Sequence, residues 1–287
     1  MNIQRVGIIG QGFVGTALKE AFSPHCEVRT YDKFREDLST HGFISCCSGC
    51  DAVFVCVPTP MKPDGSCDTS IVESVCRDID YEGIHTILPP HPTQGKIIVI
   101  KSTVPPETTQ KINIETSYPV VFNPEFLMER TATEDFKNTS RVILGGPSIA
   151  TGILNEFYLK VFPKAEIIET DSTTAELVKY ITNCFLATKV SFANEFEAIC
   201  SRLGVDYSKV IRCATQDERL GKTHWAVPGP DGKKGFGGSC FPKDVNALIY
   251  YATCMGSYPH TLIGAWNTNL EARPEKDWEK LKGRAVQ

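Results

Sequence analysis

The chain has 287 residues, of which 41% are hydrophobic, so it is long enough to form one large domain or two domains with buried cores. Its formal net charge is −4 and it contains no lysine- or arginine-rich run, which argues against nucleic acid as a partner. The sequence begins without the apolar stretch of a secretory signal and nowhere reaches the ~18 consecutive apolar residues of a membrane span, so we expect a cytoplasmic protein with no membrane partner.

The first predicted element is a strand that leads through a glycine turn into a helix, RVGIIGQGFVGTALKEAF at residues 5–22. Gly10, Gly12 and Gly15 are spaced G-x-G-x-x-G at the junction. In a dinucleotide-binding turn the first glycine permits the tight turn, the second admits a pyrophosphate and the third lets helix and strand pack closely. The N–H groups at the start of the helix would then face the phosphates.

A second strand, EVRTYD, ends in Asp32, at about the spacing from the glycine turn where a carboxylate binds the ribose hydroxyls of NAD. A carboxylate here would repel the 2′-phosphate of NADP, so the sequence favours NAD. Lys33 and Arg35 follow closely and leave NADP open. A Rossmann-like domain that binds no dinucleotide is the alternative.

The chain contains twelve cysteines, and the cluster Cys46, Cys47 and Cys50 includes a C-x-x-C. Because the chain is long and has no secretory signal, reduced thiols that pack as small hydrophobic side chains are the favoured interpretation. A zinc site needs a second pair of ligands at comparable spacing, and the sequence has no evident one. We therefore expect no metal.

Five further apolar runs follow at intervals that suit βαβ units, at residues 52–57, 96–102, 118–122, 141–146 and 165–169. Their continuous apolar character predicts a Rossmann-like, doubly wound α/β fold with a mostly parallel sheet. Ligands bind beyond the carboxyl ends of such strands, which makes candidates of Thr59, Ser102, Thr103 and Glu125, although each could be a turn residue or helix cap. Residues 85–96 are predicted to form a proline-rich surface loop.

A long helix is predicted from Thr173 to about Leu203, because this stretch lacks glycine and proline and repeats apolar residues at helical spacing. Thr173 and Glu176 would form a capping box, and Gly204 would end the helix. The sequence therefore predicts two domains, an NAD-binding domain at residues 1–171 and a helical domain at 172–287. A helix of this length should connect domains or pair with another subunit.

Lys179 and Asn183 lie four residues apart on this helix and would project from one face. A solvated lysine with a polar neighbour is the alternative interpretation.

The segment GFGGSCFPKD, residues 235–244, places glycines before a thiol and charged residues after it. Pro242 suits the first turn of a helix, so Cys240 would lie at the helix N-terminus, where the helix dipole and Lys243 favour a thiolate. Asp244 would share the face of the cysteine as a proton acceptor. The alternative is a packed thiol.

A dinucleotide site together with a cysteine nucleophile suggests a four-electron oxidation. Removal of a hydride converts an alcohol to an aldehyde, a thiolate adds to the aldehyde, and loss of a second hydride gives a thioester. Hydrolysis of the thioester then releases an acid. A two-electron hydroxy-acid dehydrogenase, which needs no cysteine, and a non-catalytic nucleotide-binding protein are the alternatives.

The chain resembles the UDP-glucose/GDP-mannose dehydrogenases, most closely the members that oxidise UDP-glucose. The resemblance covers essentially the whole chain through VGIIGQGFVG, FVCVPTP, KSTVPPET, NPEFLMER, AELVKYITNCFLATKVSFANE, DERLG and GFGGSCFPKD. It implies that two NAD are used per nucleotide sugar, with UDP-glucuronate as the product. GDP-mannose and UDP-N-acetylhexosamines are alternative substrates.

The resemblance also implies roles for single residues. Cys240 matches the catalytic cysteine, Asp244 a carboxylate that assists proton transfer, and Lys179 with Asn183 a pair that stabilises an oxyanion. Glu129 matches a carboxylate that activates water and Thr103 a residue that orders it. Cofactor contacts would come from Gly10, Gly12, Phe13, Val14, Gly15, Asp32, Lys33, Thr59, Pro60, Thr103, Glu125 and Lys243. Substrate contacts would come from Glu125, Phe126, Leu127, Lys179, Asn183, Arg219, Phe236 and Gly237.

Arg219 matches an arginine that reaches the substrate of a neighbouring subunit, so a homodimer built on the long helix is expected. Family members continue past the cysteine motif with a C-terminal nucleotide-binding domain, and the sequence ends at Gln287 without it. We expect that domain to be absent. The segment 222–234, which carries His224 and Trp225, would either replace part of the missing wall or form a surface loop.

Overall fold

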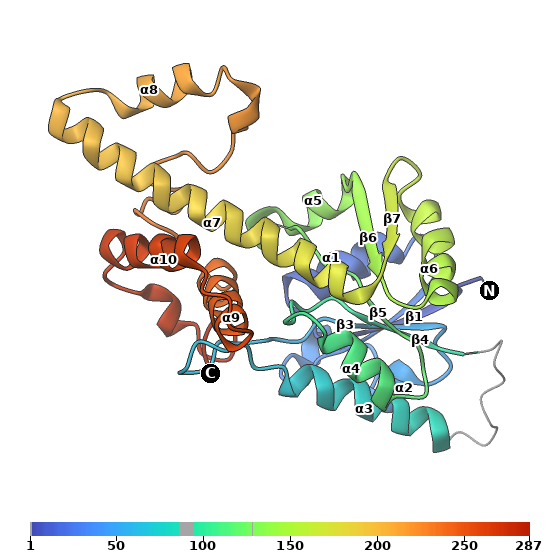
Figure 1. Ribbon diagram of the computed structural model, residues 1–287. Coiled ribbons are helices and arrows are strands. Elements are labelled where there is room, and N and C mark those ends of the chain that lie inside the picture. Colours follow the sequence, from blue (N-terminus) through green and yellow to red (C-terminus); the bar gives the residue numbers. More distant parts are fainter. Residues whose placement is uncertain (1, 86–94, 128) are drawn as a thin grey trace. The chain divides into compact units, whose positions relative to one another are not determined.

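A computed structural model describes residues 2–85, 95–127 and 129–287 (Figure 1). The proline-rich loop predicted at residues 85–96 lies largely outside the described residues. The chain divides into two compact units, one of residues 1–59 and 69–179 and the other of residues 60–68 and 180–287. Each unit is described by itself.

In the first unit the described residues form seven strands in one sheet, in the order β2-β1-β3-β4-β5-β6-β7. The pairs are parallel except β5 with β6, which meet antiparallel at Phe122 and Gly145. The predicted mostly parallel sheet is confirmed. The strands are β1 (Arg5–Ile9), β2 (Glu27–Tyr31), β3 (Ala52–Val55), β4 (Ile97–Ile100), β5 (Val120–Phe122), β6 (Arg141–Gly145) and β7 (Glu166–Thr170).

Helices cover both faces of this sheet (Figure 1). Successive strand residues point to opposite faces, so Val99 packs in the core with α1, α5 and α6, whereas Ile100 packs in the core with α2, α3 and α4. The helices are α1 (Phe13–Phe22), α2 (Phe43–Cys47), α3 (Ser70–His85), α4 (Thr108–Glu115), α5 (Ala132–Lys137) and α6 (Ser148–Val161), with 3-10 turns η1 (Glu36–Leu38) and η2 (Glu129–Thr131).

Helix α7 (Ser172–Leu203) has 32 residues, as the sequence predicts, and Gly204 follows it with a φ of +67°. The predicted capping box is wrong. Asp171 accepts the backbone N–H of Thr174, whereas Glu176 turns away and accepts N–H groups at the start of α4. The carboxylate of Glu176 in α7 therefore caps the start of α4.

The second unit is helical and contains most of α7, α8 (Tyr207–Ala214), α9 (Phe241–Cys254), α10 (His260–Ala272) and the turns η3 (Glu218–Leu220) and η4 (Asp277–Lys280). Tyr180, Phe236 and Val245 are buried in its core. The C-terminal residues pair with the segment 60–68, because Met61 donates its N–H to Ala285 and accepts that of Gln287. No helix in the described ranges has the length and apolarity needed to cross a membrane.

Candidate active site

The three glycines of the predicted dinucleotide turn have three different surroundings. Gly10 has a φ of +91°, and a Cβ there would lie 2.5 Å from the carbonyl oxygen of Cys56. A Cβ on Gly15 would lie 1.9 Å from the carbonyl oxygen of Gly10. A Cβ on Gly12, the residue before α1, would meet nothing within 4 Å. The chain itself requires Gly10 and Gly15, and Gly12 leaves room for a ligand to approach the backbone.

Asp32 lies at this turn, directly after β2. One carboxylate oxygen accepts the N–H of Gln11 at 2.7 Å, and the other accepts the N–H groups of Phe34 and Arg35 at 2.8 and 3.0 Å. The neighbouring Lys33 directs its ammonium over the ring of Phe34. The acidic residue predicted to bind the ribose is thus held beside the glycine turn.

The remaining cofactor candidates of this unit follow strand ends. The sheet order reverses between β1 and β3, and open α/β sheets bind ligands beyond the carboxyl ends of strands at such a point. Thr59 follows β3 and Thr103 follows β4, and both are buried. Phe13 and Val14 form the first turn of α1 and are half-buried. Pro60 belongs to the second unit.

Glu125 and Lys179 form a buried ion pair. The Lys179 ammonium donates to the Glu125 carboxylate at 3.1 Å and to the Glu125 carbonyl oxygen at 2.5 Å. It also lies 5.4 Å from the ring centre of Phe126, and the other Glu125 oxygen accepts the N–H of Leu127. The interpretation of Lys179 as a solvated lysine is therefore wrong. Glu129, four residues after Glu125, is exposed on η2.

Asn123 and Lys101 were not predicted from the sequence, yet they support the strand end that carries Glu125. The amide oxygen of Asn123 accepts the Lys101 ammonium at 3.0 Å and the hydroxyl of Tyr158, and its amide nitrogen donates to Ile143. Burial lowers the pKa of Lys101 to about 8. The sequence feature that could have revealed Lys101 is its position at the end of an apolar strand, just before Ser102 and Thr103.

In the second unit Cys240 precedes α9 and has no side-chain cap, with Pro242 in the first helical turn, as predicted. Cys240 is half-buried, and its carbonyl oxygen accepts the N–H of Asp244. The Asp244 carboxylate is 1% exposed and accepts Asn183 at 2.6 Å and Lys243 at 2.5 Å. A cation and an amide thus hold one carboxylate a single turn after the thiol.

Electrostatics stabilise the charged form of Lys243. Burial alone would lower the pKa of this lysine, but Asp244, together with the neighbouring Cys67 and Cys240, raises it above its ordinary value. Lys243 therefore stays protonated beside the thiol, in the position where a cation favours a thiolate.

The glycines before Cys240 are explained largely by the chain's own packing. A Cβ on Gly235 would lie 2.5 Å from the side-chain oxygen of Asn269, and one on Gly237 would lie 2.6 Å from the guanidinium of Arg273. Asn269 also binds the N–H and the carbonyl oxygen of Phe236, whose side chain is buried. Asn269 and Arg273 were missed by the sequence analysis because nothing in α10 marks them.

Two further predicted features lie at the surface of this unit. Arg219 is exposed and forms a bidentate pair with Asp217. In the segment 222–234, the Trp225 ring contacts the Lys189 ammonium and its indole N–H donates to Gly221. This part of the segment packs against α7.

Of the clustered cysteines, Cys46, Cys47 and Cys50 are buried, and burial raises the pKa of Cys46 to about 12 and that of Cys50 to about 11. The thiols of Cys46 and Cys50 are therefore poor nucleophiles at neutral pH. Within the described part of the chain, no three His, Cys, Asp or Glu side chains are grouped so that they could hold a metal.

Comparison with known proteins assigns these features to one family. Residues 33–162 match the NAD-binding domain, and residues 173–270 the central domain, of the UDP-glucose/GDP-mannose dehydrogenase family. The two matches together cover well over half of the chain. The first match identifies NAD as the dinucleotide.

Individual proteins to which the chain is similar carry names that agree with this family. The chain is 40% identical to UDP-glucose 6-dehydrogenase of Rickettsia bellii over 69% of this chain and 44% of the relative. It is 35% identical to GDP-mannose 6-dehydrogenase of Pseudomonas savastanoi over 75% of this chain and 50% of the relative. A UDP-glucose dehydrogenase structure from Pyrobaculum islandicum superposes with a TM-score of 0.81 at 29% identity, over 96% of this chain and 69% of that one. The chain thus spans about half the length of the curated relatives it matches, and it belongs to the UDP-glucose/GDP-mannose dehydrogenase family.

Proposed function

We propose that this protein oxidises the C6 hydroxyl of UDP-glucose to a carboxylate in two NAD-dependent steps, which gives UDP-glucuronate. The proposal rests on the family, on the relatives named UDP-glucose 6-dehydrogenase and on the residues grouped in each unit. The observation that carries it is Cys240 at the start of α9, with a buried carboxylate held one turn later by Lys243 and Asn183.

The residues present fit NAD, which supplies the hydride acceptor for both oxidations. The open side of Gly12 gives the pyrophosphate access to the N–H groups at the start of α1. Asp32, fixed by the N–H of Gln11, provides an acceptor for ribose hydroxyls. We assign further contacts to Thr59, Thr103, Glu125 and Lys243.

In the first oxidation the substrate hydroxyl loses its proton as the hydride leaves, and an aldehyde forms. We assign the proton to Asp244 through water. Lys179 and Asn183, one turn apart on α7, hold the developing alkoxide, since a buried cation stabilises an oxyanion far better than water does.

In the second oxidation the Cys240 sulfur attacks the aldehyde carbon, and the carbonyl oxygen takes up a proton to give a thiohemiacetal. Loss of the second hydride and of that proton leaves a thioester on Cys240. Water ordered by Thr103 and activated by Glu129 then attacks the thioester carbon. The acid leaves and the Cys240 thiol is restored.

The yield of NADH tests this scheme. With excess NAD, limiting UDP-glucose should give two NADH per sugar, and a yield of one would contradict the four-electron oxidation. Cys240→Ser should block release of acid, whereas Cys47→Ser at a buried position should not. Equal losses in both variants would remove the special role of Cys240.

A second substrate is supported by the GDP-mannose 6-dehydrogenase relative. The same NADH assay with GDP-mannose and UDP-N-acetylated sugars distinguishes the candidates. If NAD binds but no nucleotide sugar is oxidised, the chain would act as a nucleotide-binding protein instead.

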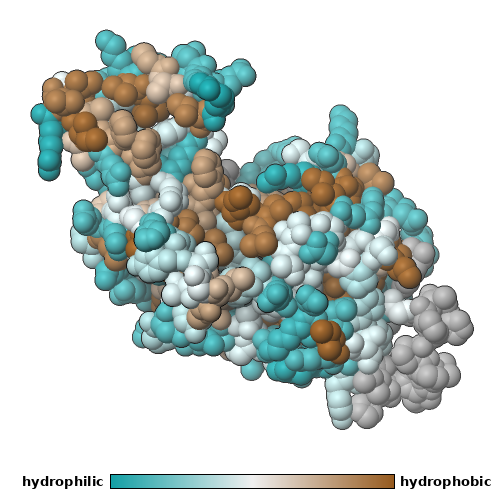
Figure 2. All heavy atoms as spheres, viewed as in Figure 1, coloured by the Kyte–Doolittle hydropathy of each residue, from teal (hydrophilic) through white to brown (hydrophobic). Residues whose placement is uncertain are grey.

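We also propose that the protein forms a homodimer through α7. Ile181, Phe185 and Leu203 are 67%, 66% and 71% exposed on this helix, and Phe192 and Phe196 pack ring against ring beside them. Figure 2 shows brown, hydrophobic side chains gathered over α8 and the adjoining end of α7. Large exposed apolar patches mark protein contacts. The solution mass should fall from dimer to monomer in Phe185→Glu but not in Ile149→Glu, at a still more exposed position on α6. A monomeric wild type would refute the proposal.

A further inference from the structure

Lys101 and Lys179 are equally buried, at 3% exposure each, but of the two only Lys179 has a carboxylate partner in the part of the chain that the structure describes. The Lys101 ammonium contacts the amide oxygen of Asn123 at 3.0 Å, and within the described ranges no carboxylate oxygen lies within 4.0 Å of it. Burial of the charged ammonium is costly and lowers the pKa of Lys101, although the nearby Glu125 carboxylate opposes this shift. The lysine is nevertheless protonated at neutral pH.

Among the described residues, Asn123 is the hydrogen-bond acceptor of Lys101, whose ammonium also lies 5.8 Å from the ring centre of Phe136. An ammonium group has three N–H donors, and Asn123 accepts one of them. Asn123 is itself committed, because its oxygen also accepts Tyr158 and its nitrogen donates to Ile143. As far as the described residues show, two donors of Lys101 remain for another acceptor.

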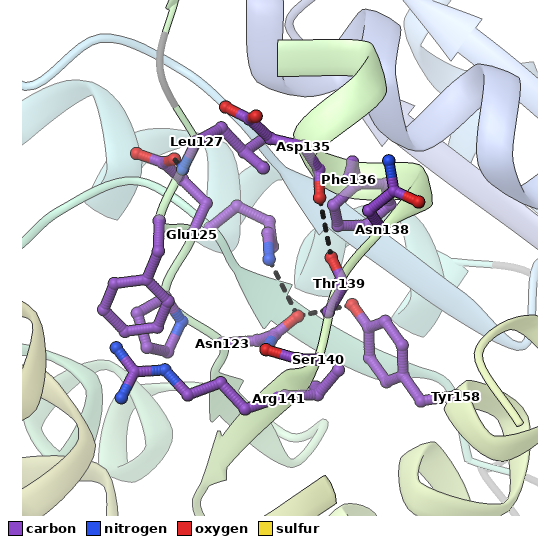
Figure 3. A pocket seen from close by; sticks show the side chains of 14 residues that line it. Asn123, Glu125, Leu127, Asp135, Phe136, Asn138, Thr139, Ser140, Arg141 and Tyr158 are labelled. Atoms are coloured by element: carbon purple, nitrogen blue, oxygen red, sulfur yellow. Dashed lines mark hydrogen bonds between the residues drawn. The ribbon is translucent and has the colours of Figure 1, made fainter. Parts of the chain in front are cut away.

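Lys101 lines a cavity of about 160 Å³ at the carboxyl ends of β4 and β5. Figure 3 shows Asn123 near the middle of this pocket, with Glu125 and Leu127 on one side and Thr139 and Tyr158 on the other. The exposed Arg141 also lines it, and its guanidinium lies 4.5 Å from the ring centre of Phe126. The lining thus brings a second cation that has no carboxylate in contact among the described residues.

The two acidic residues of the lining are already bound to donors. Glu125 accepts Lys179 and the N–H of Leu127, and Asp135 accepts the hydroxyl of Thr131. Among the described residues in and beside the lining, Lys101, Lys179 and Arg141 carry three positive charges and Glu125 and Asp135 carry two negative ones, so one positive charge is not balanced. Ser140 adds a hydroxyl to the lining.

We propose that the Lys101–Arg141 cavity binds a small oxyanion such as inorganic phosphate or sulfate. Its lining contains none of the residues of the dinucleotide turn at residues 10–15, so the two sites are distinct. A bound oxyanion would accept the two remaining donors of Lys101 and pair with Arg141 in the bidentate geometry that oxyanions favour. The proposal does not depend on the proposed oxidation, and its test needs no turnover.

The test is calorimetric titration of inorganic phosphate into the whole chain. Phosphate should bind the wild type, and its affinity should fall at least tenfold in Lys101→Met and in Arg141→Gln. The start of α1 is itself an anion site, so Gly12→Asp, which blocks it, serves as the matched control and should retain the phosphate binding that Lys101→Met and Arg141→Gln weaken. Loss in Gly12→Asp with retention in Lys101→Met would place the phosphate at the glycine turn and overturn the proposal.

Two further readouts exclude a merely structural effect. Arg141 is exposed, so Arg141→Gln tests the site even if Lys101→Met fails to fold. In protein labelled with ¹⁵N-lysine, the ammonium signal of Lys101 should shift on addition of phosphate and sulfate but not of equal chloride. No binding to the wild type, or a response to chloride as large as that to phosphate, would refute the oxyanion site.

Discussion

The chain contains two glycine-rich segments that each lead into a helix, residues 10–15 before α1 and residues 235–240 before α9. Neither helix has a side-chain cap in the described structure. The segments differ in what surrounds their glycines. The space beside Gly12 is open, whereas the side chains of Asn269 and Arg273 fill the space beside Gly235 and Gly237. Gly238 also has open space beside it, but its φ of +72° already favours glycine, whereas the φ of Gly12 is −70°.

This difference separates two uses of glycine that look the same in a sequence. Gly10 and Gly15 in the first segment, and Gly235 and Gly237 in the second, are required because the chain's own atoms approach too closely for a Cβ. A glycine that serves a ligand instead leaves open space through which the ligand can reach the backbone N–H groups at an uncapped helix start. Two other helices show the contrast, because carboxylates of Glu176 and Asp206 already occupy the starts of α4 and α8.

The largest effect should come from Gly15→Ala. The new Cβ would clash with the carbonyl oxygen of Gly10, and relief would require α1 to move away from the turn. We expect a loss of about 3 kcal/mol in the free energy of unfolding, measured by chemical denaturation, together with loss of NAD binding.

Gly12→Ala is the matched control for that change. Gly12 has a φ of −70°, which alanine adopts, and its Cβ would point into open space. Stability should fall by about 1 kcal/mol or less, whereas NAD affinity should fall at least tenfold. Equal losses of stability at the two positions would mean that the contrast between packing and ligand glycines is wrong.

The next prediction concerns Arg273, the side chain that occupies the space beside Gly237 in the second segment. Arg273 is 3% exposed and binds Asp231 and Asp277 at 2.6 and 2.7 Å. Breaking a buried pair costs ~3–5 kcal/mol, and because both carboxylates are partly exposed here we expect Arg273→Ala to cost about 2–3 kcal/mol. Arg219→Ala, which breaks an exposed pair with Asp217, should cost less than about 1 kcal/mol.

The fold was largely predictable because its signals are local. The apolar runs identify every strand of the described sheet, and the absence of glycine and proline identifies α7. The antiparallel meeting of β5 and β6 was not predicted, since strand direction depends on how the chain crosses the sheet and not on the composition of either strand.

The candidate site was predictable only where a motif marks it. Cys240 and Asp244 follow from helix spacing, and Lys179 became a candidate through the family resemblance. Lys101 and Asn269 act through contacts with residues far away in the sequence, which no local pattern reveals. The error over Glu176 has the same origin, because its partners lie 67 and 69 residues earlier in the chain.

The smallest expected effect concerns Glu176, whose carboxylate binds the N–H groups at the start of α4 in the place that a ligand would take at an uncapped helix. Burial raises the pKa of Glu176 from 4.5 to about 7, although the N–H groups of Thr109 and Glu107 oppose the shift. Between these two values the unfolded chain releases a proton that the folded chain retains, so the free energy of unfolding should fall by about 1–2 kcal/mol as the pH rises from 4.5 to 7.

Glu176→Gln should remove this pH dependence while Glu156→Gln, at an exposed position on α6, should preserve it. The slope with pH is the decisive readout, because glutamine replaces one acceptor by a donor and lowers stability at every pH. An unchanged slope in Glu176→Gln would mean that the buried carboxylate is already ionised in the folded protein at acidic pH. The start of α4 would then hold an anion as firmly as a ligand-binding helix start does, and side-chain capping would no longer distinguish α4 from α1 and α9.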